Sequence, residues 1–160
     1  MQTSTKFVRE KLTKIFTEKQ EVVDIGGGLR ISKNRGNRYD PKFPWLEELA
    51  KGVSYKILAP IPDFNPDIIG DIHQLPFRDD SVPAIICMSV LEHVENPTKA
   101  CQEMYRVLEK DGYAFIYVPF LYYYHAEAGY YKDYWRFTHD ALRLLFKDFS
   151  RVEICAVEGP

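Results

Sequence analysis

A glycine-rich turn follows the first short apolar segment of the chain. Residues 21–25 (Glu-Val-Val-Asp-Ile) run directly into Gly26, Gly27 and Gly28. Glycines at the end of a strand let the backbone approach a ligand without obstruction by Cβ atoms, and we expect their amides to face that ligand. Asp24 predicts that the ligand is cationic, because a carboxylate accepts hydrogen bonds from an amino group directly or through water. The alternative is that Asp24 only caps a tight turn.

The spacing of these glycines disfavours a nicotinamide-dependent oxidoreductase. The dinucleotide fingerprint needs a glycine three residues after its second glycine, and Ile31 occupies that position. The following segment, 29–43, is polar and rich in turn formers, so no helix N-terminus is expected there to hold a pyrophosphate.

Short apolar segments alternate with amphipathic ones along the whole chain. We expect helices at 4–17, 44–51, 96–112 and from Thr138, and strands at 21–25, 55–58, 67–71, 84–88, 113–118 and 152–157. This alternation predicts an α/β fold with a doubly wound, mostly parallel sheet in a single domain over 1–160. Residues 84–88 are continuously apolar, as in a central strand that is covered on both faces. In the helix that Gly112 is expected to end, the predicted buried stripe is Cys101, Met104, Tyr105 and Leu108.

Four stretches in this order resemble the motifs of class I S-adenosylmethionine-dependent methyltransferases. They are 22–28, 70–77, 86–94 and 103–108, and the resemblance extends from about residue 22 to residue 120. Their order and spacing are similar to the small-molecule, type 11-like branch that includes ubiquinone-biosynthesis-type enzymes. The resemblance implies a Rossmann-like fold, S-adenosylmethionine as cofactor and methyl transfer as the reaction.

The resemblance also assigns residues to the cofactor. Asp24 and the turn of Gly26, Gly27 and Gly28 would line the methionine moiety. Asp71 and the amide of Ile72 would bind the adenine edge, and Met88 and Ser89 would flank the sugar and the sulfonium. For Asp71, a simple turn residue at a strand end is the alternative.

Two features depart from the family pattern. Ala59 and Pro60 stand where family members usually carry an acid that binds both ribose hydroxyls, and Asp63 is the nearest substitute. The chain also stops where a complete fold would return with an antiparallel strand, so we expect a fold trimmed at the C-terminus or a dimer mate or partner chain on that sheet edge. These departures favour an alternative function, a degenerate non-catalytic module used for protein interaction.

The aromatic-rich segment 121–137 is long for a loop and predicts the acceptor side of the site. It resembles a segment of bacterial methyltransferases often encoded with glycan-building enzymes, which implies a small-molecule or glycan acceptor, methylated at a hydroxyl. An alcohol acceptor needs a base near neutral pH, and His125 is the first candidate and Asp133 the second. Arg136 could clamp an acidic acceptor. The alternative is that Arg136 pairs with Asp133 or Asp140 beneath packed aromatics.

Glu92 and His93 are adjacent, but the sequence offers no further ligands with metal-site spacing. We therefore expect no metal, and a structural role for this pair at a helix start. The formal net charge of −2 argues against nucleic acid and anionic membranes as partners. The charged N-terminus and the three widely spaced cysteines favour the cytoplasm. The basic stretch Arg30, Lys33, Arg35 and Arg38 is interpreted as a solvated loop, and a patch facing an anionic substrate or a partner is the alternative.

Overall fold

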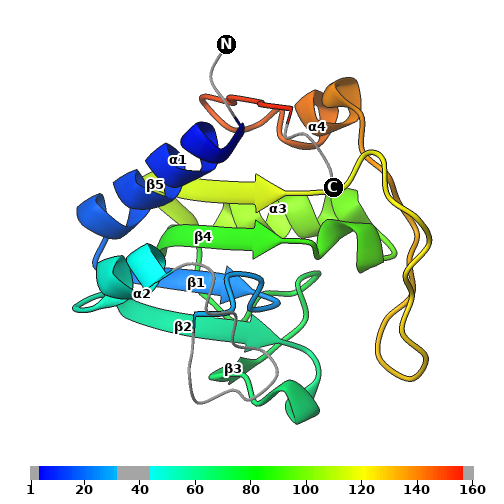
Figure 1. The fold of residues 1–160 in the computed structure, drawn as a ribbon, viewed down its shortest axis with the longest axis horizontal. Coiled ribbons are helices and arrows are strands. Elements are labelled where there is room, and N and C mark those ends of the chain that lie inside the picture. The colour runs from blue at the N-terminus through cyan, green and yellow to red at the C-terminus, as the bar shows by residue number, and fades with distance from the viewer. Residues whose placement is uncertain (1–3, 32–43, 157–160) are drawn as a thin grey trace.

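The computed structural model describes residues 4–31 and 44–156 and has a parallel β-sheet at its centre (Figure 1). The sheet order is β3-β2-β1-β4-β5, and every neighbouring pair is parallel. The strands are β1 (Glu21–Ile25), β2 (Ser54–Ala59), β3 (Ile68–Ile69), β4 (Val82–Met88) and β5 (Leu108–Tyr117). The α/β prediction is therefore confirmed. The basic residues Lys33, Arg35 and Arg38 lie outside the described residues.

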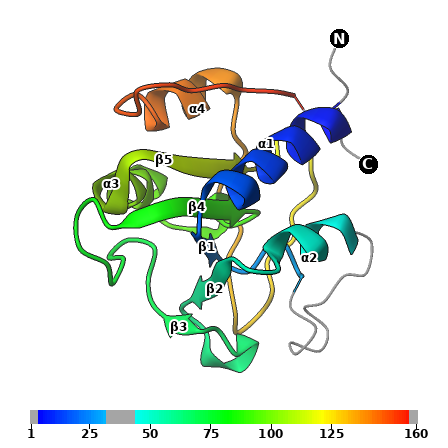
Figure 2. The same ribbon diagram turned by 90° about the vertical axis from the view of Figure 1, so that its left-hand side faces the viewer.

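Helices cover both faces of the sheet (Figure 2). Helices α1 (Ser4–Glu18) and α2 (Pro44–Ala50) lie on one face, and α3 (Pro97–Val107) lies on the other, with α4 (His139–Leu145) beside it. The short 3-10 helices η2 (Pro62–Phe64) and η3 (Leu91–His93) follow β2 and β4. No helix in the described parts of the chain is long and apolar enough to span a bilayer.

Alternate residues of the central strands enter two separate cores. Ala84 and Ile86 of β4 pack with α1 and α2, whereas Ile85 and Cys87 pack with α3 and α4. This division follows from the period of two along a strand. It confirms the prediction that this strand is covered on both faces.

Three predicted elements differ from the structure. Helix α3 ends at Val107, and β5 begins at once with Leu108, which pairs with Val82 across a register shift. The expected helical stop, Gly112, therefore lies within β5. Tyr105 is 50% exposed and not part of a buried stripe, because its ring packs edge-on against Phe149 on the surface.

The expected third strand, 67–71, is reduced to Ile68–Ile69, and residues 152–156 form no strand. In this last segment, Glu153 is held by an ion pair with Lys11 of α1 at 2.7 Å. A side-chain contact to a helix therefore replaces the sheet pairing that the apolar pattern predicts.

Candidate functional site

A continuous hollow passes the carboxyl ends of the parallel strands, where ligands bind in open α/β sheets, and extends further over parts of α1, α4 and β5. The structure brings nearly all the predicted cofactor residues to this hollow. Those that line it are Gly26, Gly27, Gly28, Asp71, Ile72, Met88 and Ser89. Asp24 is the exception, since it is fully buried beneath the glycine turn.

The buried carboxylate of Asp24 holds the glycine turn in shape by hydrogen bonds. It accepts hydrogen bonds from the amide of Gly28 at 3.2 Å, the amide of Leu29 at 3.1 Å and the hydroxyl of Tyr55 at 2.5 Å. Burial raises the pKa of Asp24 to about 6, although these three donors act against the rise. The carboxylate thus accepts hydrogen bonds within the fold, and its burial prevents direct contact with a ligand.

The glycines pack against the end of β4. A Cβ on Gly28 would lie 2.6 Å from the Cβ and carbonyl oxygen of Met88, and one on Gly26 would lie 2.5 Å from Val90. The amide of Gly26 donates to the carbonyl of Leu58 at 2.7 Å, and that of Gly28 donates to Asp24. The expectation that these two amides face a ligand is therefore wrong. The turn thus offers a ligand a backbone surface without side chains, whereas the N–H groups of Gly26 and Gly28 are bonded within the fold.

Asp71 is exposed at the rim of the hollow. It accepts hydrogen bonds from the amide of His73 at 2.8 Å and from the ring Nδ1 of His73 at 2.7 Å. Partial burial raises the pKa of Asp71, but these hydrogen bonds and the imidazole charge outweigh it and hold the pKa below its usual value. The Asp71 carboxylate is thus oriented by its neighbour while it stays accessible.

Helix α3 fixes the segment that carries Asp71. The Glu103 carboxylate accepts a hydrogen bond from the amide of Leu75 at 3.0 Å. Arg106 donates to the carbonyl oxygens of Leu75 at 3.1 Å and Phe77 at 3.0 Å. These two α3 residues belong to a motif of the family resemblance, but the sequence analysis assigned them no role. The signal was available in the charged pair spaced three residues apart on an otherwise apolar helix face.

The end of β2 carries no acid. Ala59 is buried there, and Asp63, the suggested substitute, is exposed in η2 and does not line the hollow. The neighbouring Phe64 instead stacks on Tyr130 of the long loop, with ring centroids 5.2 Å apart.

The loop 121–137 runs past the carboxyl edge of the sheet (Figure 1). The amides of Tyr134 and Trp135 donate to the carbonyl oxygen of Glu92 at 2.7 and 3.2 Å. The amide of Phe137 donates to Pro119 at 3.1 Å and closes the base of the loop. The loop is therefore an ordered outer wall of the hollow, attached to η3.

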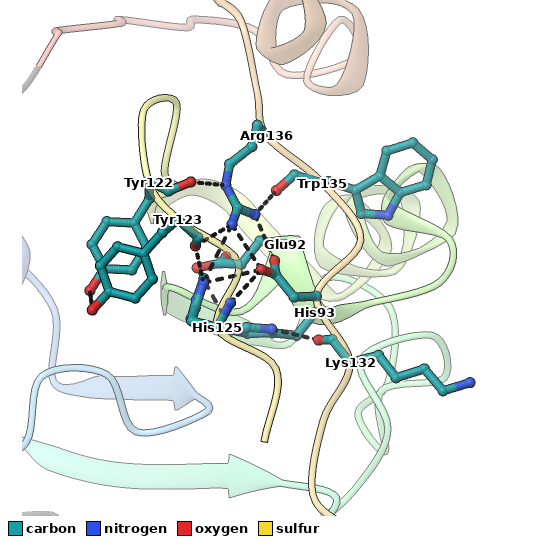
Figure 3. A network of polar contacts seen from close by, with 9 residues as sticks. Glu92, His93, Tyr122, Tyr123, His125, Lys132, Trp135 and Arg136 are labelled. Carbon is teal, nitrogen blue, oxygen red and sulfur yellow. Dashed lines mark hydrogen bonds and ion pairs between the residues drawn. The ribbon is translucent and has the colours of Figure 1, made fainter. Parts of the chain in front are cut away.

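The predicted acceptor-side residues lie together in this wall, but two of them bind each other. Arg136 donates to both oxygens of Asp133, at 2.6 and 2.8 Å, and to the carbonyl oxygens of Tyr122, Tyr123 and Trp135 (Figure 3). Asp133 is 1% exposed in its side chain, and the Arg136 guanidinium holds the pKa of this carboxyl well below its usual range. Of the alternatives weighed from the sequence, the structure shows Arg136 paired with Asp133, not with Asp140.

His125 is placed by the same pair. Its amide donates to Asp133 at 2.9 Å, and its ring lies beside the hollow. One ligand atom of His125, one of Glu92 and one of His93 all lie within 4.8 Å of one another. Burial raises the pKa of Glu92 to about 7 and lowers that of His93. The sequence analysis missed this grouping because His125 is distant in sequence and reaches η3 only through the folded loop.

Comparison with known proteins finds similarity to methyltransferases over part of the chain. Residues 48–116 match the model of the methyltransferase domain family. The chain is 29% identical over 102 residues to the ubiquinone/menaquinone biosynthesis C-methyltransferase of Ruegeria sp. (strain TM1040). Both matches agree with the resemblance to methyltransferases that the sequence motifs carry. The match to the C-methyltransferase covers 58% of this chain and 40% of that relative, so the chain spans well under half the length of the methyltransferase it matches.

Solved structures share the fold of this chain. The complex of the Haloferax volcanii methyltransferase activator Trm112 with a protein assigned as a methyltransferase matches with a TM-score of 0.61 and 21% identity, over 88% of this chain and 65% of that one. The [4+2]-cyclase SpnF matches with a TM-score of 0.56 and 15% identity, over 89% of this chain and 55% of that one. Because one of these folds is named a cyclase, the fold alone does not define the reaction.

Proposed function

We propose that the chain binds S-adenosylmethionine and transfers its methyl group to a hydroxyl of a small molecule or glycan. The observation that carries the proposal is the hollow itself. It joins the bare glycine turn after β1, the exposed carboxylate of Asp71 after β3 and the backbone at Ser89 after β4. The match of residues 48–116 to methyltransferase domains supports the same function.

The adenine would bind at the end of β3. This base offers an amino donor beside a ring-nitrogen acceptor, which the Asp71 carboxylate and the Ile72 amide complement. The methionine moiety would lie on the bare surface of Gly26, Gly27 and Gly28, with the sugar and sulfonium beside Met88 and Ser89. Asp24 would act indirectly, by holding the turn in shape.

Methyl transfer is an in-line displacement at the methyl carbon. The acceptor oxygen forms a bond to that carbon while the carbon–sulfur bond breaks. The electron pair of the broken bond stays on sulfur, which gives S-adenosylhomocysteine. The acceptor proton would pass to His125, with Asp133 and Arg136 as positioning residues. His125 fits this role because Asp133 fixes its backbone and its ring lies on the wall of the hollow.

The acceptor class follows from the outer wall. Phe120 and Tyr124 line the hollow and are 60% and 74% exposed. Exposed aromatic faces with a few polar groups suit a sugar or a planar ring. The curated relative is named a C-methyltransferase, so the hydroxyl acceptor rests on this wall and not on that relative.

A second candidate is a non-catalytic module that keeps the fold without binding the cofactor well. It is favoured by Ala59, which leaves no carboxylate at the end of β2 for the ribose hydroxyls. Each charge-assisted hydrogen bond contributes roughly 1.5–3 kcal/mol, so the loss of a ribose acceptor weakens the cofactor site.

Isothermal titration with S-adenosylhomocysteine separates the two candidates. We expect micromolar binding by the unaltered chain and a loss of about 10- to 100-fold in Asp71→Ala, which removes one charge-assisted hydrogen bond. Asp63→Ala is the matched control, because this exposed aspartate lies outside the hollow. An absence of binding at millimolar ligand, or equal losses in both variants, would overturn the proposal.

A further inference from the structure

Glu92, His93 and His125 present ligand atoms to one small volume at the carboxyl end of β4 (Figure 3). We propose that these three side chains bind a divalent transition-metal ion. The inference stands on the geometry of the three residues and does not depend on cofactor binding. It is contrary to the expectation from the sequence, in which the pair Glu92 and His93 lacked a third ligand.

The ring of His93 is held in the form that a metal ligand needs. Its Nδ1 lies 2.7 Å from the carbonyl oxygen of Lys132, which can only accept. Nδ1 therefore carries the proton and donates it, and Nε2 keeps its lone pair. This Nε2 lies on the side of Glu92, 3.9 Å from Oε1.

His125 is held in the same way. Its Nδ1 lies 3.1 Å from the carbonyl oxygen of Tyr123 and 3.2 Å from Oδ2 of Asp133, and both atoms are acceptors. The remaining neighbour, a nitrogen of Arg136, is farther away at 3.4 Å. The two nearer acceptors place the proton on Nδ1 and leave Nε2 available. Metal-binding histidines are commonly oriented by such a carbonyl or carboxylate on the second ring nitrogen.

Glu92 supplies the independent observation that points to a ligand. Its side chain is 1% exposed, and its Oε2 is the buried side-chain atom without a hydrogen-bond partner in the described parts of the chain. An unsatisfied buried carboxylate oxygen is destabilising, so native structures rarely keep one without a function. A cation between Glu92 and the two imidazoles would satisfy it.

The size and the charge of this three-residue cluster agree with a transition-metal ion. Bonds from such an ion to nitrogen or oxygen are about 2.0–2.2 Å long, so two ligand atoms can lie at most about 4.4 Å apart across it. The cluster spans up to 4.8 Å and would contract slightly on binding. Two imidazoles with one carboxylate suit Zn²⁺, Fe²⁺ or Mn²⁺ better than Mg²⁺, which prefers oxygen ligands. The nearby charge of Arg136 is balanced by its pairing with Asp133.

Three protein ligands leave positions open for a further oxygen ligand. A metal ion lowers the pKa of a bound hydroxyl, so the acceptor proton would then pass to solvent water and not to His125, whose free ring nitrogen would be bound to the ion. This consequence rests on the proposed function, whereas the metal site itself does not.

The test uses protein stripped with a chelator and titrated with Zn²⁺ by calorimetry and with Co²⁺ by visible absorption. We expect about one ion per chain and a Co²⁺ spectrum with imidazole and carboxylate ligands. Glu92→Gln and the double variant His93→Gln/His125→Gln should lose both signals, and Asp133→Asn should weaken binding by about 10- to 100-fold. His139→Gln is the control, since this exposed histidine of α4 lies outside the cluster.

A comparison without metal keeps misfolding apart from lost binding. Glu92→Gln removes a buried charge at nearly constant volume, so its metal-free melting temperature should equal or exceed that of the unaltered protein. Absence of Zn²⁺ and Co²⁺ binding, or equal affinity in the double variant, would overturn the inference. Titration of the stripped protein with S-adenosylhomocysteine reports separately on the proposed cofactor site.

Discussion

The guanidinium group of Arg106 donates two hydrogen bonds to the Glu103 carboxylate, at 2.9 and 2.7 Å. Both residues lie on α3, and they also bind the backbone of Leu75 and Phe77 in the segment that begins at Asp71. Arg106 donates in addition to the Asp79 carboxylate at 2.7 Å. The position of the proposed adenine contact therefore depends on an ion pair on the neighbouring helix. This relationship gives a structural reason for two motif residues that do not belong to the proposed cofactor contacts.

We predict that Glu103→Gln lowers the free energy of unfolding at pH 7 by about 1–3 kcal/mol, because an amide weakens the bonds to Arg106 and Leu75. Hydrogen bonding from Arg106 lowers the pKa of Glu103 to about 2, although burial opposes the shift. The carboxylate thus stabilises the fold above its unfolded pKa near 4.5, and this contribution is lost as the pH falls through 2. Urea unfolding at several pH values should show the two proteins converging in acid.

Gln102→Ala is the control for this experiment, because Gln102 is exposed on the same helix. This substitution should change the free energy of unfolding by no more than about 0.5 kcal/mol, and it should leave the pH dependence of that energy unchanged. If Glu103→Gln matched this control at pH 7, the Glu103–Arg106 pair would not be what holds the segment.

The stability contribution of Asp24 should change with pH in the opposite direction to that of Glu103. The pKa of Asp24 in the folded chain is about 6, above the usual 3.8, so ionisation of this buried group opposes folding. Its contribution to stability is fully present below pH 4 and falls by up to about 3 kcal/mol as the pH rises through 6. Asp24→Asn, which does not titrate, should lack this decline. Chemical unfolding between pH 4 and pH 7 measures the difference.

At low pH, Asp24→Asn should be less stable than the unaltered chain by about 1–3 kcal/mol. An asparagine has one acceptor oxygen, and its amide would face the N–H of Gly28 or Leu29. Tyr55→Phe offers a second check, since loss of the donor at 2.5 Å should raise the pKa of Asp24 further. A stability difference that stayed constant with pH would contradict the assignment of the titration to Asp24.

Much of the architecture could be predicted because burial leaves a pattern in the sequence. The apolar run at 84–88 and the segment 21–25 are strands whose every second residue enters one core, and the glycine turn follows from Gly26, Gly27 and Gly28. The predictions failed at 152–156 and at the end of α3. At both places, apolar residues suit a strand or a helix equally, and tertiary contacts decide between them.

Most of the predicted cofactor residues line one hollow in the structure, but the hydrogen bonds among the site residues could not be predicted from the sequence. Asp24 was predicted to contact the ligand, but the sequence could not show that Tyr55 and the turn amides use its carboxylate. Likewise, His125 and the pair Glu92 and His93 were each noticed, but their proximity depends on a long loop folding back onto η3. Long-range contacts of this kind leave no periodic signal in a single sequence.

Gly28 offers a test of close packing without backbone strain. A Cβ at this position would lie 2.6 Å from the carbonyl oxygen of Met88, which cannot rotate away. Gly28→Ala should therefore cost about 1–3 kcal/mol of stability and weaken S-adenosylhomocysteine binding together. Gly52→Ala, at a positive φ of 89° but with open space around it, should lower stability alone. Thermal melts and calorimetry on both variants separate these outcomes.

The outer wall should depend on Arg136 more than on any surface cation. Its removal in Arg136→Ala leaves the Asp133 carboxylate buried without its partner and frees three backbone carbonyls, so we expect a loss of about 2–4 kcal/mol. Limited proteolysis should cut this variant faster within 121–131. Arg143→Ala on α4 removes an exposed guanidinium of equal charge and is the matched control. If both variants were cut at the rate of the unaltered chain, backbone contacts would hold the loop without Arg136. These are the bonds from the amides of Tyr134 and Trp135 to Glu92 and from the amide of Phe137 to Pro119.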